Sequence, residues 1–149
     1  MKILLASDHA GFELKNKIKD FLIEEKFEIE DMGAHTLDID DNYTEIMMPL
    51  AMRILKDTEN TKAVIFGKSG QGEAMLMNRF PGIRAIVYHG KNLEIIKLVR
   101  EHNDSNILSI GADFVDFEEA KEAIRLWLST PFSNQERYIK RIEQMDNIE

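Results

Sequence analysis

The sequence predicts an α/β fold in which helices cover both faces of a parallel sheet. Two observations carry this prediction: short apolar runs alternate with segments of helical period, and Gly or Pro residues separate many of them. Repeated β-α units of this kind form parallel sheets with right-handed crossovers. The chain has 149 residues, 44% of them hydrophobic, which suits one domain (1–149) with a substantial core.

The first half of the chain contains three predicted strands and two predicted helices. Residues 2–6 form an apolar run typical of a buried strand, and apolar side chains then follow helical spacing from residue 14 to residue 22. Residues 27–31 predict a second strand, and residues 46–55 a second helix. Residues 62–66 predict a third strand, which leads directly into a glycine-rich loop.

The second half repeats the alternation. Residues 73–79 predict a short helix that ends before Pro81, followed by a strand over 84–88 and a helix over 93–101. A fifth strand over 107–110 stops at Gly111, and a helix over 117–128 ends before Pro131. The sheet should therefore have five strands.

A C-terminal helix is predicted over residues 135–149, beyond the last strand. Its apolar stripe is weak and consists of Ile139, Ile142 and Met145. A narrow stripe offers little surface to the core of its own domain. We therefore expect this helix to pack on a partner subunit.

Composition excludes several classes of function. The net charge of −8 and the pI of about 5.1 argue against a nucleic-acid partner, which needs a basic face. The absence of cysteine excludes disulfides, thiolate metal sites and a cysteine nucleophile, and it fits a reducing cytoplasm. No apolar run approaches the roughly 18–20 residues that a membrane helix requires. The N-terminal run is too short for a signal peptide, so we expect a cytoplasmic protein.

Polar residues cluster where the predicted strands end. Ligands of parallel α/β sheets gather at the carboxyl ends of the strands. In this chain those ends carry Ser7-Asp8-His9, Gly67–Glu73, His89-Gly90 and Gly111-Ala112-Asp113. We interpret His89, like His35, as structural or peripheral.

The glycine-rich loop is the strongest of these signals, with the sequence Gly67-Lys68-Ser69-Gly70-Gln71-Gly72-Glu73. Three glycines let backbone N–H groups approach an anion closely, and a carboxylate at the start of a helix suggests proton transfer. The loop matches neither the Walker pattern nor the dinucleotide fingerprint. The alternatives are a tight structural turn and an acid placed to suit the helix dipole.

Three other groups of residues have both a functional and a structural interpretation. The Asp8–His9 pair suits sugar hydroxyls, phosphate or proton transfer, but it also suits turn and cap chemistry. His102 and Asn103 end a helix, where a histidine is often a cap partner. Arg137 and Arg141 stand at i and i+4, a spacing that a shared anion would favour, although Glu136 and Glu143 could compensate them on a solvated face.

Several of these features occur together in one family. The chain resembles the type B ribose-5-phosphate isomerases and the related galactose-6-phosphate isomerase subunits from residue 2 to about residue 143. The segments that carry the resemblance are Ser7-Asp8-His9-Ala10-Gly11-Phe12-Glu13-Leu14-Lys15, Gly70-Gln71-Gly72-Glu73, Asn78-Arg79-Phe80-Pro81-Gly82-Ile83-Arg84-Ala85, Arg100-Glu101-His102-Asn103-Asp104-Ser105-Asn106 and Thr130-Pro131-Phe132.

The resemblance implies a three-layer α/β/α Rossmann-like sandwich and a homodimer, or a tetramer built from two dimers. The active sites would be shared across the subunit interface, with no metal and no organic cofactor. The reaction would interconvert an aldose phosphate and a ketose phosphate, as in the pentose phosphate pathway. After ring opening, a base takes a proton from C2 and returns it to C1 through an enediolate.

The family pattern also assigns roles to residues. His102 would open the ring, while Asp8, Asn103 and Tyr43 would contact the sugar. His9, Arg137 and Arg141 would bind phosphate, and the arginines would reach in from the partner subunit. Ser69 would hydrogen-bond near C1 and C2. The substrate-binding loop would include Gly67 and Lys68, and the N–H groups around Gly70, Gln71 and Gly72 would stabilise the enediolate oxygen.

The resemblance indicates Glu73 as the base. Many members of the family use a cysteine at the position of Gly67, whereas a second branch has glycine there and a glutamate at the position of Glu73. This chain fits the second branch. Partial burial should raise the pKa of Glu73 toward the range that suits a base, against the effect of the helix dipole.

Three departures from the family pattern bear on the substrate. Asp113 stands where an arginine usually helps to hold phosphate, Lys68 where glycine is usual, and Thr44 where proline is usual. We expect ribose 5-phosphate as the substrate. The alternatives are galactose 6-phosphate, allose 6-phosphate, a tetrose phosphate or an unphosphorylated sugar. Two further alternatives are a subunit that needs a paralogous partner, and a sugar-phosphate-binding module without catalysis.

Overall fold

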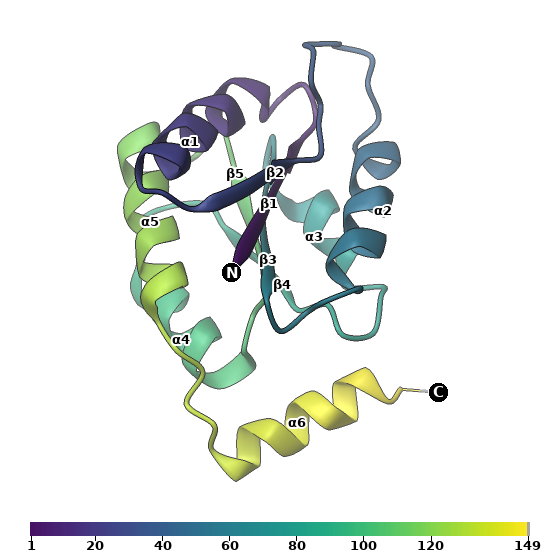
Figure 1. Cartoon of the computed structure of the whole chain (residues 1–149), viewed down its shortest axis with the longest axis vertical. Coiled ribbons are helices and arrows are strands. Elements are labelled where there is room, and N and C mark those ends of the chain that lie inside the picture. Colours follow the sequence, from purple (N-terminus) through teal and green to yellow (C-terminus); the bar gives the residue numbers. More distant parts are fainter. Residues whose placement is uncertain (149) are drawn as a thin grey trace.

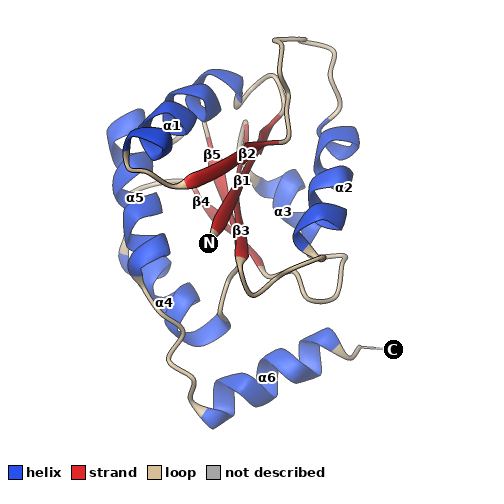
Figure 2. Ribbon diagram, in the orientation of Figure 1, coloured by secondary structure: helices blue, strands red, loops and turns tan. Residues whose placement is uncertain are grey.

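Five parallel strands form one sheet in the order β2-β1-β3-β5-β4, with helices on both faces (Figure 1, Figure 2). The structure is a computed structural model that describes residues 1–148. Glu149, the last residue of the predicted C-terminal helix, lies outside the described residues.

The elements follow one another as the sequence predicts, which confirms the fold class. They are β1 (Lys2–Ser7), α1 (Phe12–Glu24), β2 (Glu28–Asp31), α2 (Tyr43–Ile54), β3 (Thr61–Gly67), α3 (Gln71–Met77), β4 (Ala85–Tyr88), α4 (Glu94–Asn103), β5 (Ile107–Gly111), α5 (Phe117–Ser129) and α6 (Glu136–Asp146). The largest shifts are of three residues: α6 ends that far before the predicted end, and α2 begins that far before the predicted start. The Asn42 side chain accepts a hydrogen bond from the Thr44 N–H and caps the helix there.

Each face of the sheet has its own buried cluster. Ile3 and Leu5 of β1 belong to the cluster under α1, α4 and α5, which includes the fully buried Trp127. Leu4 and Ala6 point the other way and belong to the cluster under α2 and α3. Because both faces are covered, the strands read as continuous apolar runs rather than as alternating patterns.

The strand order places a crevice at the carboxyl ends of β1 and β3. From β1 the chain passes through α1 to the edge strand β2, whereas β3 lies on the other side of β1. Such a reversal of direction opens a crevice in which ligands of α/β sheets bind. In the sheet register, Ser7 pairs with Phe66 and Gly67 pairs with Gly111, so the polar segments that follow these strands are neighbours.

Helix α6 lies at the end of the molecule opposite the loop that joins β2 to α2 (Figure 1). Tyr138 is its one buried residue among those described, and near its C-terminus Asp146 accepts a hydrogen bond from the Gly82 N–H and pairs with Arg84. Ile139 and Met145 remain exposed. The packing of α6 on a partner subunit stays a prediction.

Among residues 1–148, no helix is long and apolar enough to cross a membrane.

Candidate active site

The glycine-rich loop turns sharply between β3 and α3. Gly70 precedes the helix with a φ of +75°, a conformation that favours glycine. Its carbonyl accepts a hydrogen bond from the buried Ser109 hydroxyl at 2.7 Å, and the Gly67 carbonyl accepts one from the Ala112 N–H at 2.8 Å. Strand β5 therefore fixes the loop. The first N–H groups of α3 have no partner within the helix, and that of Gln71 donates to the Ser69 hydroxyl at 3.3 Å.

The Glu73 carboxylate lies directly against the Cα of Gly67. A Cβ built on Gly67 would overlap this carboxylate, with Oε2 only 2.5 Å away. Any larger residue at position 67 would therefore have to displace the carboxylate. The predicted link between glycine at position 67 and glutamate at position 73 has a steric basis. A side chain at position 67, such as the cysteine of other family members, would need the space that the Glu73 carboxylate occupies.

Burial sets the protonation behaviour of Glu73. The residue is 4% exposed, although it stands in the first turn of α3. Desolvation raises the pKa of its carboxyl above the ordinary 4.5, its own backbone N–H opposes this, and the charge of Asp8 adds to the increase. The predicted direction is correct. Because Ser7 pairs with Phe66, Asp8 follows β1 beside Gly67, against which the Glu73 carboxylate lies.

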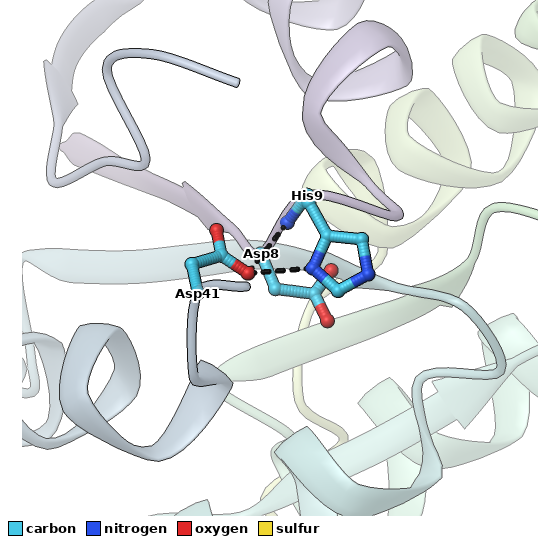
Figure 3. A group of neighbouring side chains, drawn as sticks. All are labelled: Asp8, His9 and Asp41. Carbon is cyan, nitrogen blue, oxygen red and sulfur yellow. Dashed lines mark hydrogen bonds and ion pairs between the residues drawn. The ribbon is translucent and has the colours of Figure 1, made fainter. Parts of the chain in front are cut away.

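Asp8, His9 and Asp41 lie together near the end of β1, and hydrogen bonds join His9 to Asp41 (Figure 3). Asp8 Oδ1 accepts from the N–H groups of Ala10 and Gly11 at 3.0 and 3.2 Å. Asp41 Oδ1 lies 2.6 Å from His9 Nδ1 and accepts from the His9 backbone N–H at 3.1 Å. Each acid thus uses one oxygen to order the backbone around the crevice.

The same three residues bring oxygen and nitrogen atoms within 4.8 Å of one another, a spacing that a metal ion would also suit. Hydrogen bonds already engage one candidate ligand atom of each residue. Asp41 Oδ1 and His9 Nδ1 engage each other, and Asp8 Oδ1 engages two backbone N–H groups.

A buried ion network holds the start of the loop that carries Asp41. The Lys15 ammonium is fully buried and donates to Asp31 and to the Ala34 carbonyl, both at 2.7 Å. The Ser7 N–H donates to the Gly33 carbonyl and the Ser7 carbonyl accepts from the Ala34 N–H, both at 2.7 Å, so the start of this loop is also tied to β1. Tyr43, just beyond the loop, reaches the glycine-rich loop, because a Cβ built on Gly72 would lie 2.9 Å from its hydroxyl.

Lys68 and Asp113, which follow β3 and β5, form an ion pair. Their charged atoms lie 3.8 Å apart, and both side chains are exposed. The Asp113 N–H also donates to the Lys68 carbonyl at 3.1 Å. Two of the three residues that depart from the family pattern therefore partly neutralise each other.

The remaining predicted site residues stand on α4 and α6, and three of them surround Tyr138. The His102 ring stacks on the Tyr138 ring with centroids 4.5 Å apart, and Arg137 donates to the Tyr138 hydroxyl at 2.6 Å. Arg141 lies over the same ring at 5.8 Å. Asn103 lines a groove of about 630 Å³ between the end of α6 and the segment from Asn78 to Ile86.

The two groups lie at opposite ends of the sheet within one chain. Helix α4 ends with His102 and Asn103, just before the start of β5, whereas the glycine-rich loop pairs with the residues at the end of β5. Strand β5 spans five residues, or roughly 13 Å at about 3.3 Å per step. One chain therefore brings Asp8, His9, Tyr43, Ser69 and Glu73 together but leaves His102, Asn103, Arg137 and Arg141 apart from them.

Sequence reasoning missed two residues of these groups, Asp41 and Tyr138. Asp41 is one of several acids in a loop without regular structure, so nothing in the sequence distinguishes it from Asp38 or Asp40. Tyr138 carried a signal that could have been used. It stands between the two arginines of a polar-rich helix, where an aromatic side chain is unusual.

Glu73→Gln should stabilise the fold at pH 8. Because folding raises the Glu73 pKa above 4.5, the folded chain binds more protons than the unfolded chain just above that pH. Stability therefore falls as the pH rises through this window. The isosteric amide removes the buried charge, and a gain of about 1 kcal/mol would raise Tm by about 2–4 °C. Below pH 4.5 the two Tm values should converge.

The control for this measurement is Glu45→Gln, which neutralises an exposed acid in the first turn of α2. It should show no such gain at pH 8. A Glu73→Gln protein less stable than the wild type at pH 8 would contradict the account, because it would mean that the buried carboxylate is held by favourable charge interactions.

Comparison with known proteins agrees with this geometry. The family model described as Ribose/Galactose Isomerase matches residues 3–145. Ribose-5-phosphate isomerase B of Mycolicibacterium paratuberculosis is 34% identical over 143 residues, which cover 96% of this chain and 88% of the relative. Galactose-6-phosphate isomerase subunit LacA of Enterococcus faecalis is 29% identical over 140 residues, 94% of each chain.

Among solved structures, ribose-5-phosphate isomerase B of Mycoplasma genitalium with bound ribulose-5-phosphate superposes with a TM-score of 0.91. The match has 26% sequence identity and covers 97% of this chain and 93% of that one. The resemblance predicted from the sequence is thereby confirmed: this chain belongs to the ribose/galactose isomerase family.

Proposed function

We propose that this protein interconverts ribose 5-phosphate and ribulose 5-phosphate, with Glu73 as the base. The observation that carries the assignment of the base is the buried Glu73 carboxylate against Gly67, next to the N–H groups of the glycine-rich loop. An aldose–ketose isomerase needs a base of raised pKa beside donors that stabilise an enediolate. Relatives named ribose-5-phosphate isomerase B, one of them with ribulose-5-phosphate bound, support the choice of substrate.

The steps follow from the positions of the groups. His102 exchanges the protons that open the sugar ring, while Asp8 and Tyr43 hold the sugar hydroxyls. Glu73 then removes the proton from C2, and Ser69 with the N–H groups from Gly70 to Gly72 stabilises the enediolate oxygen. The proton of the O2 hydroxyl moves to O1, and protonated Glu73 returns its proton to C1, which leaves the carbonyl at C2. Base and acid are the same carboxyl, so a pKa above 4.5 serves both half-reactions.

A complete site in this proposal needs two copies of the chain. Glu73 and His102 lie at opposite ends of the strands of one chain, so a sugar phosphate held by Glu73 would meet the His102 of the partner. The α6 arginines of the partner would then bind phosphate near His9. The separation of the two groups and the exposed apolar side chains of α6 support a two-fold dimer with shared sites.

The ion pair between Lys68 and Asp113 bears on the choice of sugar. An unpaired acid at position 113 would repel a phosphate, but Lys68 lies 3.8 Å from it and offsets its charge. A phosphorylated substrate therefore remains compatible with Asp113.

Catalytic efficiency should be highest with ribose 5-phosphate. We expect its kcat/KM to exceed those for galactose 6-phosphate, allose 6-phosphate and erythrulose 4-phosphate by at least about tenfold. Free ribose should be poorer by about 100-fold or more, because it lacks the charged group that His9 and the arginines bind. Higher efficiency with free ribose than with its phosphate would show that His9, Arg137 and Arg141 do not form a phosphate site.

Two inactive variants should complement each other in a mixed dimer. Glu73→Gln and His102→Ala should each lower turnover by at least about 100-fold without unfolding the chain. In a heterodimer purified through two different tags, one site would carry both substitutions and the other site neither. Such a dimer should have about half the wild-type turnover, as two-fold symmetry requires.

The matched control is a heterodimer of Glu73→Gln with Ser69→Ala. Both residues lie in the same loop, so each site would contain one substitution and turnover should stay low. An inactive heterodimer of Glu73→Gln with His102→Ala would place both residues in a site made by one chain, against the proposal.

A further inference from the structure

Asp41 makes two contacts with His9 through a single oxygen. Oδ1 accepts from the His9 backbone N–H at 3.1 Å and lies 2.6 Å from the ring nitrogen Nδ1 (Figure 3). The Asp41 side chain is 12% exposed, and its other oxygen, Oδ2, is buried without a hydrogen-bond partner among the described residues. A charged carboxylate this far from water is costly unless a nearby group stabilises it.

These contacts fix the tautomer of the His9 ring. A carboxylate oxygen that accepts from the backbone N–H can only accept from the ring as well, so Nδ1 carries the proton. The second nitrogen, Nε2, is then the atom that the ring offers to a ligand. In the neutral ring Nε2 is an acceptor, and in the cation it is a donor.

The surroundings of the ring favour the cation. The hydrogen bond to Asp41 raises the pKa of His9 above the ordinary 6.5 against the effect of desolvation, and Asp8 and Asp38 act at longer range in the same direction as Asp41. All three acids come from the segments that follow β1 and β2. A histidine cation with a free N–H in the crevice is suited to an anion.

We propose that Asp41 is a positioning residue for the phosphate subsite, where it holds His9 in one orientation and as a cation whose Nε2–H donates to the phosphate of the substrate. The proposal rests on the proposed function, which supplies the phosphorylated substrate. It gives a role to an acid in an irregular loop whose first residues are held by the buried Lys15.

The first test concerns the ring alone and needs no substrate. NMR titration of the His9 ring should give a pKa above 6.5 in the wild type and a lower one in Asp41→Asn, because the amide is isosteric but uncharged. Above the pKa, nitrogen shifts should show the Nδ1–H tautomer in the wild type. The matched control is Asp40→Asn, which neutralises an exposed neighbour without a side-chain contact to His9, and it should leave the titration unchanged.

The second test measures the consequence for phosphate. At pH 7, Asp41→Asn should raise KM for ribose 5-phosphate about tenfold and change kcat by less than about threefold, since the phosphate is remote from the reacting carbons. The inhibition constant of inorganic phosphate should rise to the same extent. In the wild type, KM should increase as the pH rises through the His9 pKa, and in Asp41→Asn this increase should begin at lower pH.

The outcomes distinguish a failure of the proposed isomerase function from a failure of the role of Asp41. A wild-type protein without isomerase activity would contradict the proposed function, while the NMR titration and phosphate binding would still test Asp41. An unchanged His9 pKa in Asp41→Asn would overturn the role of Asp41, as would a lowered pKa without weaker phosphate inhibition. Should Asp41→Asn fail to fold, a His9 pKa below 6.5 in the wild type would overturn it as well.

Discussion

The position of the Glu73 carboxylate against Gly67 is the constraint on which the site depends. A buried carboxylate needs space, and the chain provides it by having no side chain at position 67. The same lack of solvent raises the carboxyl pKa toward the range in which one group can both remove and return a proton. Burial of this kind costs stability at neutral pH, as is common for groups whose pKa is adapted to catalysis.

The length of the strands imposes the second constraint. A strand of five residues separates the glycine-rich loop from the end of α4, so side chains at the two ends of β5 cannot meet around one small sugar within a chain. At one end of the sheet, His102 and the α6 arginines pack around Tyr138. At the other end, the segments after β1 and β3 and the loop before α2 carry the acids Asp8, Glu73 and Asp41. Association of two copies would unite the groups, which would link catalysis to assembly.

The fold could be predicted almost completely from the sequence, because the apolar runs and helical spacings are local signals. Strand order could not, since it depends on which strands pair over long separations. Candidate residues at the strand ends, such as Asp8 and Glu73, followed from the rule that ligands bind at carboxyl ends. The contact of Asp41 with His9 could not be predicted, because the two residues are 32 positions apart in the sequence and Asp41 lies in an irregular loop. The stacking of Tyr138 on His102 depends likewise on tertiary packing.

Cleavage of the C2–H bond tests the central claim most directly. The measurement follows deuterium leaving C2 of ribose 5-phosphate labelled at that position, with wild type, Glu73→Gln and Gly67→Ala. The account predicts that both variants stay folded, that Glu73→Gln slows the step by at least about 100-fold, and that Gly67→Ala slows it by at least about tenfold because its Cβ displaces the carboxylate. Cleavage at the wild-type rate in folded Glu73→Gln would contradict the assignment of the base.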